Sequence, residues 1–168
     1  MWTATAHEWA MGYLRQAEAD IRAAGILQGE EPSVTAMLLQ MALEKLGKAA
    51  LLRSGQITIE RARSSHAAAS SMVQQLARNP RAYRRLGYKP DVVRWTLAPL
   101  VDSLERCHPT RTPGGPHLEY PWQASSGEIQ WPAKHLEVVK AFRPTSTSVS
   151  RLYAFVETLS NRFDQVFP

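Results

Sequence analysis

Apolar side chains recur at spacings of three and four residues between Ser33 and Ser54, in the stretch SVTAMLLQMALEKLGKAALLRS. This spacing predicts a helix with a wide buried face. The residues of that face are Val34, Met37, Leu38, Met41, Leu46, Ala49, Ala50 and Leu52. We expect Ser33 to cap the helix after Pro32, and Gly55 to end it.

Four further segments show helical periodicity: Thr5–Leu27, about Ser65–Pro80, Pro90–Cys107 and Ser146–Phe167. Pro99 lies inside the third of these, where a missing backbone N–H predicts a kink. Three consecutive alanines, residues 67–69, predict a close approach to a neighbouring backbone. The pattern therefore predicts an all-α fold, an up-and-down bundle of four to five helices.

Residues 109–144 depart from this pattern and contain six of the eleven prolines. Two short apolar runs flank the sequence QASSG there, which predicts a small hairpin. We expect the arm to dock onto the bundle through Leu118, Tyr120, Trp122, Ile129 and Trp131. The prediction is a single domain over residues 1–168, with residues 109–144 as a proline-rich insertion before the last helix.

Composition narrows the class of protein. No segment reaches the roughly 18 uncharged apolar residues of a membrane span. The first residues carry acids instead of the basic residues of a leader sequence. We therefore expect a cytoplasmic protein without a membrane partner. Cys107 is the single cysteine and falls at a helical spacing that predicts a core position. The net charge of +5 comes with fifteen arginines and five lysines, a balance compatible with a phosphate-rich partner.

A polar stripe accompanies the apolar face of residues 33–54, because Gln40, Glu44 and Lys48 stand four residues apart. The run QMALEKLGKAALL, followed by SSHAAASSMVQQL, resembles HEPN domains, the helical bundles of prokaryotic nucleotidyltransferase partners, toxins and antiviral defence proteins. The resemblance covers roughly residues 6–108. It implies a HEPN-like bundle, a homodimer, a toxin–antitoxin or defence setting, and a possible nucleotidyltransferase or other protein partner. It also favours Gln40, Glu44 and Lys45 as a polar seam toward the first helix or a second subunit.

Two stretches match the R-x4-6-H spacing of HEPN proteins that cut RNA. They are Arg61 with His66 and Arg111 with His117. The resemblance implies metal-independent chemistry, in which histidine moves a proton and arginine stabilises charge on phosphorus. The two pairs are alternatives to each other. The favoured alternative is a non-catalytic role for all four residues; for His66 this is a buried hydrogen bond to Glu44 or Gln40.

The segment RNPRAYRRLGYK, residues 78–89, has five positive charges, no negative charge and two tyrosines. Guanidinium groups beside aromatic faces suit unpaired RNA. The candidate RNA-binding residues are Arg78, Arg81, Tyr83, Arg84, Arg85 and Lys89. The alternative is a solvated turn between helices.

The sequence predicts neither a metal site nor a cofactor. Histidines and the cysteine in the second half lack the close pairing of a zinc motif, and a glycine-rich phosphate loop is absent. Three functions remain open: recognition of RNA, a nucleotide or a protein partner; RNA cleavage through an Arg/His pair; and a structural subunit. In the last case Trp122 and Trp131 would anchor a partner protein.

Overall fold

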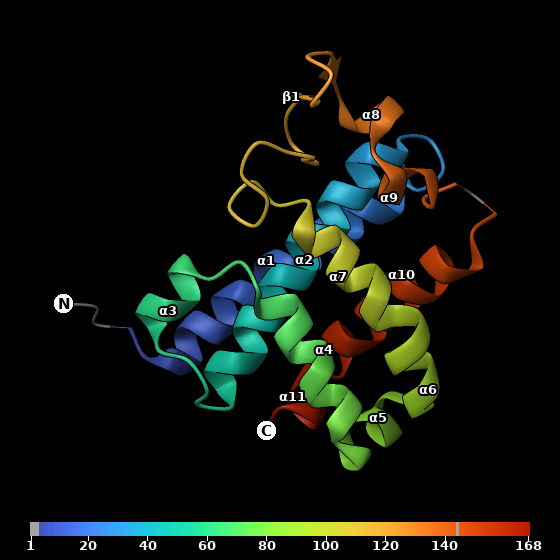
Figure 1. Ribbon diagram of the computed structural model, residues 1–168. Helices are drawn as coiled ribbons and strands as arrows, with labels where there is room; N and C mark the ends of the chain where they lie inside the picture. Colours follow the sequence, from blue (N-terminus) through green and yellow to red (C-terminus); the bar gives the residue numbers. More distant parts are fainter. Residues whose placement is uncertain (1–3, 144) are drawn as a thin grey trace.

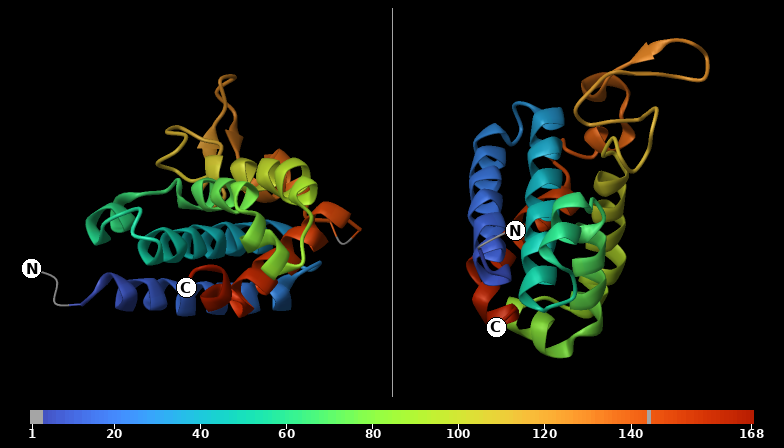
Figure 2. Two further views of the ribbon diagram at one scale, coloured as in Figure 1. Left: turned by 90° about the horizontal axis from the view of Figure 1, so that it is seen from below. Right: turned by 90° about the vertical axis from the view of Figure 1, so that its left-hand side faces the viewer.

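The computed structural model describes residues 4–143 and 145–168, and the chain in these ranges is mainly helical (Figure 1). Two long helices, α1 (Ala6–Leu27) and α2 (Pro32–Arg53), are joined by a four-residue turn and pack along each other. Helix α2 lies between α1 and a layer that contains α4 (Ala68–Arg78) and α7 (Ala98–Arg106), as Figure 2 shows. This central position explains why α2 is buried on most of its circumference.

Local signals set the ends of the first two helices. Thr5 caps α1 in a capping box with Glu8. The predicted cap at Ser33 is wrong, because Pro32 occupies the first helical position and Glu31 is the cap residue. Proline suits that position since its φ is already helical and it needs no hydrogen-bond acceptor.

The segment that follows α2 is less regular than predicted. A short helix, α3 (Ile59–Ser64), is capped by Thr58, and α4 begins only at Ala68. The predicted close approach of the alanines is present, since a Cβ added to Gly47 of α2 would lie 2.4 Å from the backbone carbon of Ala68. Helices α2 and α4 therefore meet backbone against backbone.

The interpretation of residues 78–89 as a turn is wrong. Residues Pro80–Leu86 form helix α5. The Asn79 side chain accepts hydrogen bonds from the backbone N–H groups of Arg81 and Ala82, and Gly87 ends the helix at a φ of 76°. Proline after an N-cap asparagine is a helix start signal, and it outweighs the polar composition.

The irregularity predicted at Pro99 takes the form of a wider helical turn. Helix α6 (Pro90–Val92) runs into a π-helical segment, η1 (Val93–Leu97), and then into α7. Because Pro99 has no N–H to donate to the preceding turn, the regular hydrogen-bond ladder is interrupted there.

Helix α7 also supplies the cap of α4. The buried carboxylate of Glu105 on α7 accepts hydrogen bonds from the backbone N–H groups of Ala69 and Ser70, at 3.0 and 3.2 Å.

The predicted hairpin is present but short. Strands β1 (Trp122–Gln123) and β2 (Ile129–Gln130) pair antiparallel and project at the opposite end of the molecule from α5 (Figure 1). Tyr120, Ile129 and Trp131 are exposed, so the expectation that they dock the arm is wrong.

Leu118 and Trp122, two of the predicted docking residues, do pack against the core, and the other contacts come from residues after the hairpin. Helices α8 (Pro132–His135) and α9 (Glu137–Lys140), which the sequence pattern did not predict, follow the hairpin. The buried residues of the arm are His117, Leu118, Leu136, Val139 and Phe142. Pro144, the last proline of the arm, lies outside the described residues.

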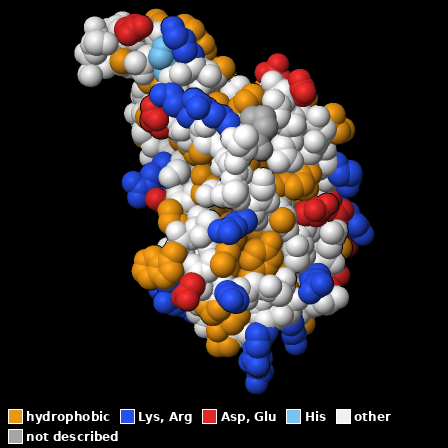
Figure 3. Space-filling model, turned by 90° about the vertical axis from the view of Figure 1, so that its right-hand side faces the viewer, with side chains coloured by type: hydrophobic (Ala, Val, Ile, Leu, Met, Phe, Trp, Pro, Cys, Tyr) orange, Lys and Arg blue, Asp and Glu red, His pale blue; other side chains and the backbone are white. Residues whose placement is uncertain are grey.

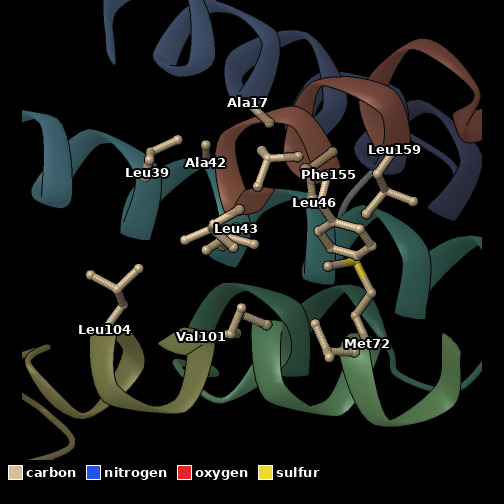
Figure 4. Packing of buried hydrophobic residues seen from close by; sticks show 14 of the residues in the cluster. Ala17, Leu39, Ala42, Leu43, Leu46, Met72, Val101, Leu104, Phe155 and Leu159 are labelled. Atoms are coloured by element: carbon tan, nitrogen blue, oxygen red, sulfur yellow. The ribbon is translucent and has the colours of Figure 1, made fainter. Parts of the chain in front are cut away.

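The last helix divides in two, because α10 (Thr147–Asn161) ends at Arg162 and α11 (Phe163–Val166) follows. Ser146 caps α10, which begins where the sequence pattern predicted a helix from about residue 146. Figure 4 shows Phe155 and Leu159 of α10 among Leu43 and Leu46 of α2 and Met72 of α4.

No helix in the described ranges has both the length and the apolarity that a membrane crossing requires.

Candidate functional site

A cluster of four polar side chains joins three parts of the fold. Glu44 and Lys48 lie on α2, His66 lies between α3 and α4, and His108 follows α7. Lys48 Nζ is 2.6 Å from Glu44 Oε1, and His66 Nδ1 is 3.3 Å from Glu44 Oε2. The rings of His66 and His108 stack at 4.0 Å between centroids. We name these four residues the histidine centre.

The charge at the middle of the histidine centre is the Glu44 carboxylate. Burial alone would raise the pKa of Glu44, but the hydrogen bonds and charges of Lys48 and His66 outweigh burial and lower that pKa below its ordinary value. Glu44 is therefore ionised at neutral pH and acts only as an acceptor. It follows that Nδ1 of His66 carries the proton of their hydrogen bond and that Nε2 is left with a lone pair in the neutral ring.

His108 has the opposite arrangement of its ring nitrogens. Its Nδ1 accepts the backbone N–H of Thr110 at 3.2 Å and lies 2.8 Å from Thr110 Oγ1. Because a backbone N–H can only donate, Nδ1 of His108 is unprotonated, and Nε2 carries the proton. Burial, together with repulsion from His66, lowers the pKa of His108 and favours this neutral form.

With both rings neutral, the histidine centre presents a ring with a free lone pair, His66, next to a ring with a free N–H, His108. A carboxylate that fixes the tautomer of a histidine is the usual arrangement for a general base. The ligand atoms of Glu44, His66 and His108 lie within 4.8 Å of one another and could hold a metal ion. However, the ring planes are only 18° apart, so their in-plane lone pairs do not converge on one point. Proton exchange fits this geometry better than metal binding.

The structure brings neither predicted Arg/His pair together. Among the described residues, no hydrogen bond, ion pair or ring contact joins Arg61 to His66 or Arg111 to His117, and both arginines are exposed. His117 is 8% exposed, with a buried Nδ1 that lacks a hydrogen-bond partner. His66 instead makes the hydrogen bond to Glu44 that was its alternative role.

The predicted polar seam divides into separate contacts. Lys45 reaches α1 and pairs with Asp20, with 2.5 Å between Nζ and Oδ2. Glu44 turns to the histidine centre, and Gln40 is buried at 4% exposure. The role of these residues as an interface between subunits stays a prediction.

The predicted RNA-binding residues lie at the end of the molecule formed by the last residue of α4, by α5 and the turn after it, and by α6 with η1. Arg78, Arg81, Arg84 and Lys89 are exposed, and Tyr83 is partly buried. In Figure 3, lysine and arginine side chains project at the lower end, where α5 lies. Arg85 is used structurally, because it donates to the carbonyl of Gln165 and its own carbonyl accepts from Arg162. We call residues 78–95 the basic end.

Trp95 is a feature of the basic end that the sequence analysis missed. It lies on η1 next to the exposed Arg94, and 72% of its surface is accessible. It follows Lys89 by six residues. The sequence did contain a signal for this residue. The apolar periodicity of residues 93–107 requires no core residue at position 95, yet a tryptophan stands there. The two tryptophans named from the sequence lie on the arm, Trp122 half-buried and Trp131 exposed.

Comparison with known proteins found no match to this chain among family models, curated proteins or solved structures. What the chain shows directly is a mostly helical domain with a small hairpin, a histidine centre and a basic end.

Proposed function

We propose that this protein is an RNA-binding protein and that the basic end is the RNA-binding surface. One observation carries the proposal: a tryptophan that is 72% exposed lies in a segment, residues 78–95, with six basic residues and one acidic residue. An exposed tryptophan beside arginine and lysine side chains offers an aromatic face on which a base can stack. Guanidinium groups that contact phosphates and an aromatic ring that stacks on a base are the two elements of single-strand recognition.

The HEPN-like sequence runs support the choice of RNA and the setting of that function. They favour a HEPN-like bundle that acts as a homodimer or with a nucleotidyltransferase or other protein partner. They also favour a prokaryotic stress, toxin–antitoxin or antiviral defence context. These assignments rest on residues 40–52 and 64–76 and are part of the proposal.

Replacing the exposed tryptophan tests base stacking. We expect Trp95→Ala to weaken binding of a fluorescein-labelled oligouridine of about 12 nucleotides roughly tenfold, since one stacked base contributes about 1–3 kcal/mol. Fluorescence anisotropy measures the affinity. Trp131→Ala is the matched control, because Trp131 is also exposed but lies on the arm; we expect it to bind like the wild type. Equal affinity of Trp95→Ala and wild type would contradict a stacking role.

A second candidate function is metal-independent RNA cleavage at the histidine centre. The specific observation is the complementary pair of tautomers, with His66 Nε2 as an acceptor and His108 Nε2–H as a donor. His66 would take the proton of a ribose 2′-OH while the 2′ oxygen bonds to phosphorus. The bond from phosphorus to the 5′ oxygen breaks, and the proton passes from His66 to that leaving oxygen. His108 would donate to a phosphate oxygen, and a 2′,3′-cyclic phosphate results.

Cleavage in the presence of a chelator tests this candidate. We expect the wild type to cut single-stranded RNA in excess EDTA, and His66→Ala to lower the rate at least 100-fold, the usual contribution of a positioned base. His7→Ala, which removes an exposed histidine of α1, serves as the control. RNA that stays intact with the wild type, or cleavage that survives in His66→Ala, would exclude the histidine centre as a nuclease site.

A further inference from the structure

A large pocket lies between the bundle and the arm, and its lining includes no residue of the histidine centre or of the basic end. Its volume is about 780 Å³, within the range of pockets that enclose a small organic molecule. Helix α7 forms one wall, the hairpin and the glycine turn before it form a second, and α8 with α9 forms the third. The proline-rich arm thus builds a concave site that the bundle alone does not have.

The pocket has a fixed aromatic wall. Trp122 lines it and is packed so closely against Gly115 that a Cβ added to this glycine would lie 2.5 Å from Trp122 Cβ. Leu100, Leu136 and Val138 supply aliphatic surface from α7 and the α8–α9 segment. A rigid indole with aliphatic groups around it suits a flat, apolar ring.

The polar groups of the pocket favour an anion. Arg106 pairs with Asp102 at 2.8 Å, but the Arg106 side chain is 71% exposed, so the guanidinium exchanges partners at little cost. Nδ1 of His135 accepts the backbone N–H of Trp131 at 3.1 Å, which leaves Nε2–H as a donor.

The remaining titratable groups of the pocket add little negative charge. Glu137 also lines it, and Lys140 neutralises this carboxylate in an ion pair. Burial raises the pKa of Cys107 to about 11, so its thiol is uncharged at neutral pH.

We propose that this pocket binds a small, flat aromatic molecule that carries one anionic group. The ring packs against Trp122, and the anionic group accepts hydrogen bonds from Arg106 and His135. The site is formed by different residues from those proposed to bind RNA, so each proposal stands or fails by itself.

The probe for this proposal is 8-anilinonaphthalene-1-sulfonate, a flat aromatic anion whose fluorescence rises on binding, with N-phenyl-1-naphthylamine as its uncharged analogue. We expect one saturable sulfonate site per chain. Ser103→Trp places an indole inside the pocket from α7 and should weaken binding of both probes at least tenfold. Arg106→Gln should weaken the sulfonate several-fold and leave the uncharged analogue unchanged. Arg151→Gln, an exposed arginine of α10, is the matched control.

Two results would overturn the proposal. Unchanged probe binding in Ser103→Trp, with wild-type circular dichroism and thermal midpoint, would show that the probe binds elsewhere. Equal weakening of the charged and uncharged probes by Arg106→Gln would show that the pocket does not select an anion.

Discussion

Gly47→Ala is expected to destabilise the fold by about 3 kcal/mol or more, even though alanine is the better helix former by about 1 kcal/mol. The added Cβ would lie 2.4 Å from the backbone carbon and oxygen of Ala68 and 2.8 Å from the nitrogen of Ala69. These atoms belong to the backbone at the start of α4, so no side-chain rotation relieves the overlap. Helices α2 and α4 would have to separate, and the packing shown in Figure 4 would loosen with them.

Gly12→Ala provides the matched control for this prediction. Gly12 also lies inside a long helix, α1, but it is exposed, and a Cβ added there meets nothing within 4 Å. We expect this variant to gain about 0.5–1 kcal/mol from helix propensity alone. Urea unfolding monitored by circular dichroism measures both changes. Shifts of the two midpoints in the same direction would contradict the contact between α2 and α4.

Elements with strong local signals could be predicted from the sequence. Helices α1 and α2 have uninterrupted apolar periodicity and end near glycine or proline, and both are found within two residues of their predicted bounds. The charged composition of α5 obscures the cap signal at Asn79, so the sequence pattern did not predict this helix. The division between α10 and α11 at Arg162 has no local signal, since the apolar spacing continues through it. These results show that periodicity located the helices better than composition did.

The histidine centre could be predicted only in part. The hydrogen bond between His66 and Glu44 was one open alternative, because both residues lie on predicted helices close in sequence. His108 was not predicted, since its contact with His66 depends on how α7 packs against α2 and α4. The cap of α4 by Glu105 was not predicted either, because this residue lies 35 and 36 residues along the chain from the two N–H groups that it accepts. Periodicity identifies buried faces, but it does not say which polar groups meet between them.

The arm shows where composition misleads. Its large apolar residues looked suited to docking, yet Tyr120, Ile129 and Trp131 are exposed. Leu136 and Phe142 are buried instead, and both follow the hairpin in short helical turns. Of the three exposed residues only Ile129 lies in a strand, and a two-residue strand pair has one face toward the protein and one toward water.

The dependence of RNA affinity on salt concentration tests the proposed RNA-binding surface directly. Each phosphate contact on a single strand contributes about −0.7 to the slope of log K against log salt. Arg81 and Arg84 are exposed on α5, whereas Arg22 and Arg151 are exposed on α1 and α10. Two double variants therefore remove the same charge from different surfaces. One combines Arg81→Gln with Arg84→Gln, and the control combines Arg22→Gln with Arg151→Gln.

The measurement is anisotropy of the labelled oligouridine over a series of sodium chloride concentrations. We expect the wild type to give a steep negative slope, and the α5 double variant to give a slope shallower by about 1.4 with weaker binding throughout. The control double variant should keep the wild-type slope. A wild-type affinity that does not change with salt, or an equal change of slope in the two double variants, would contradict RNA binding at the basic end.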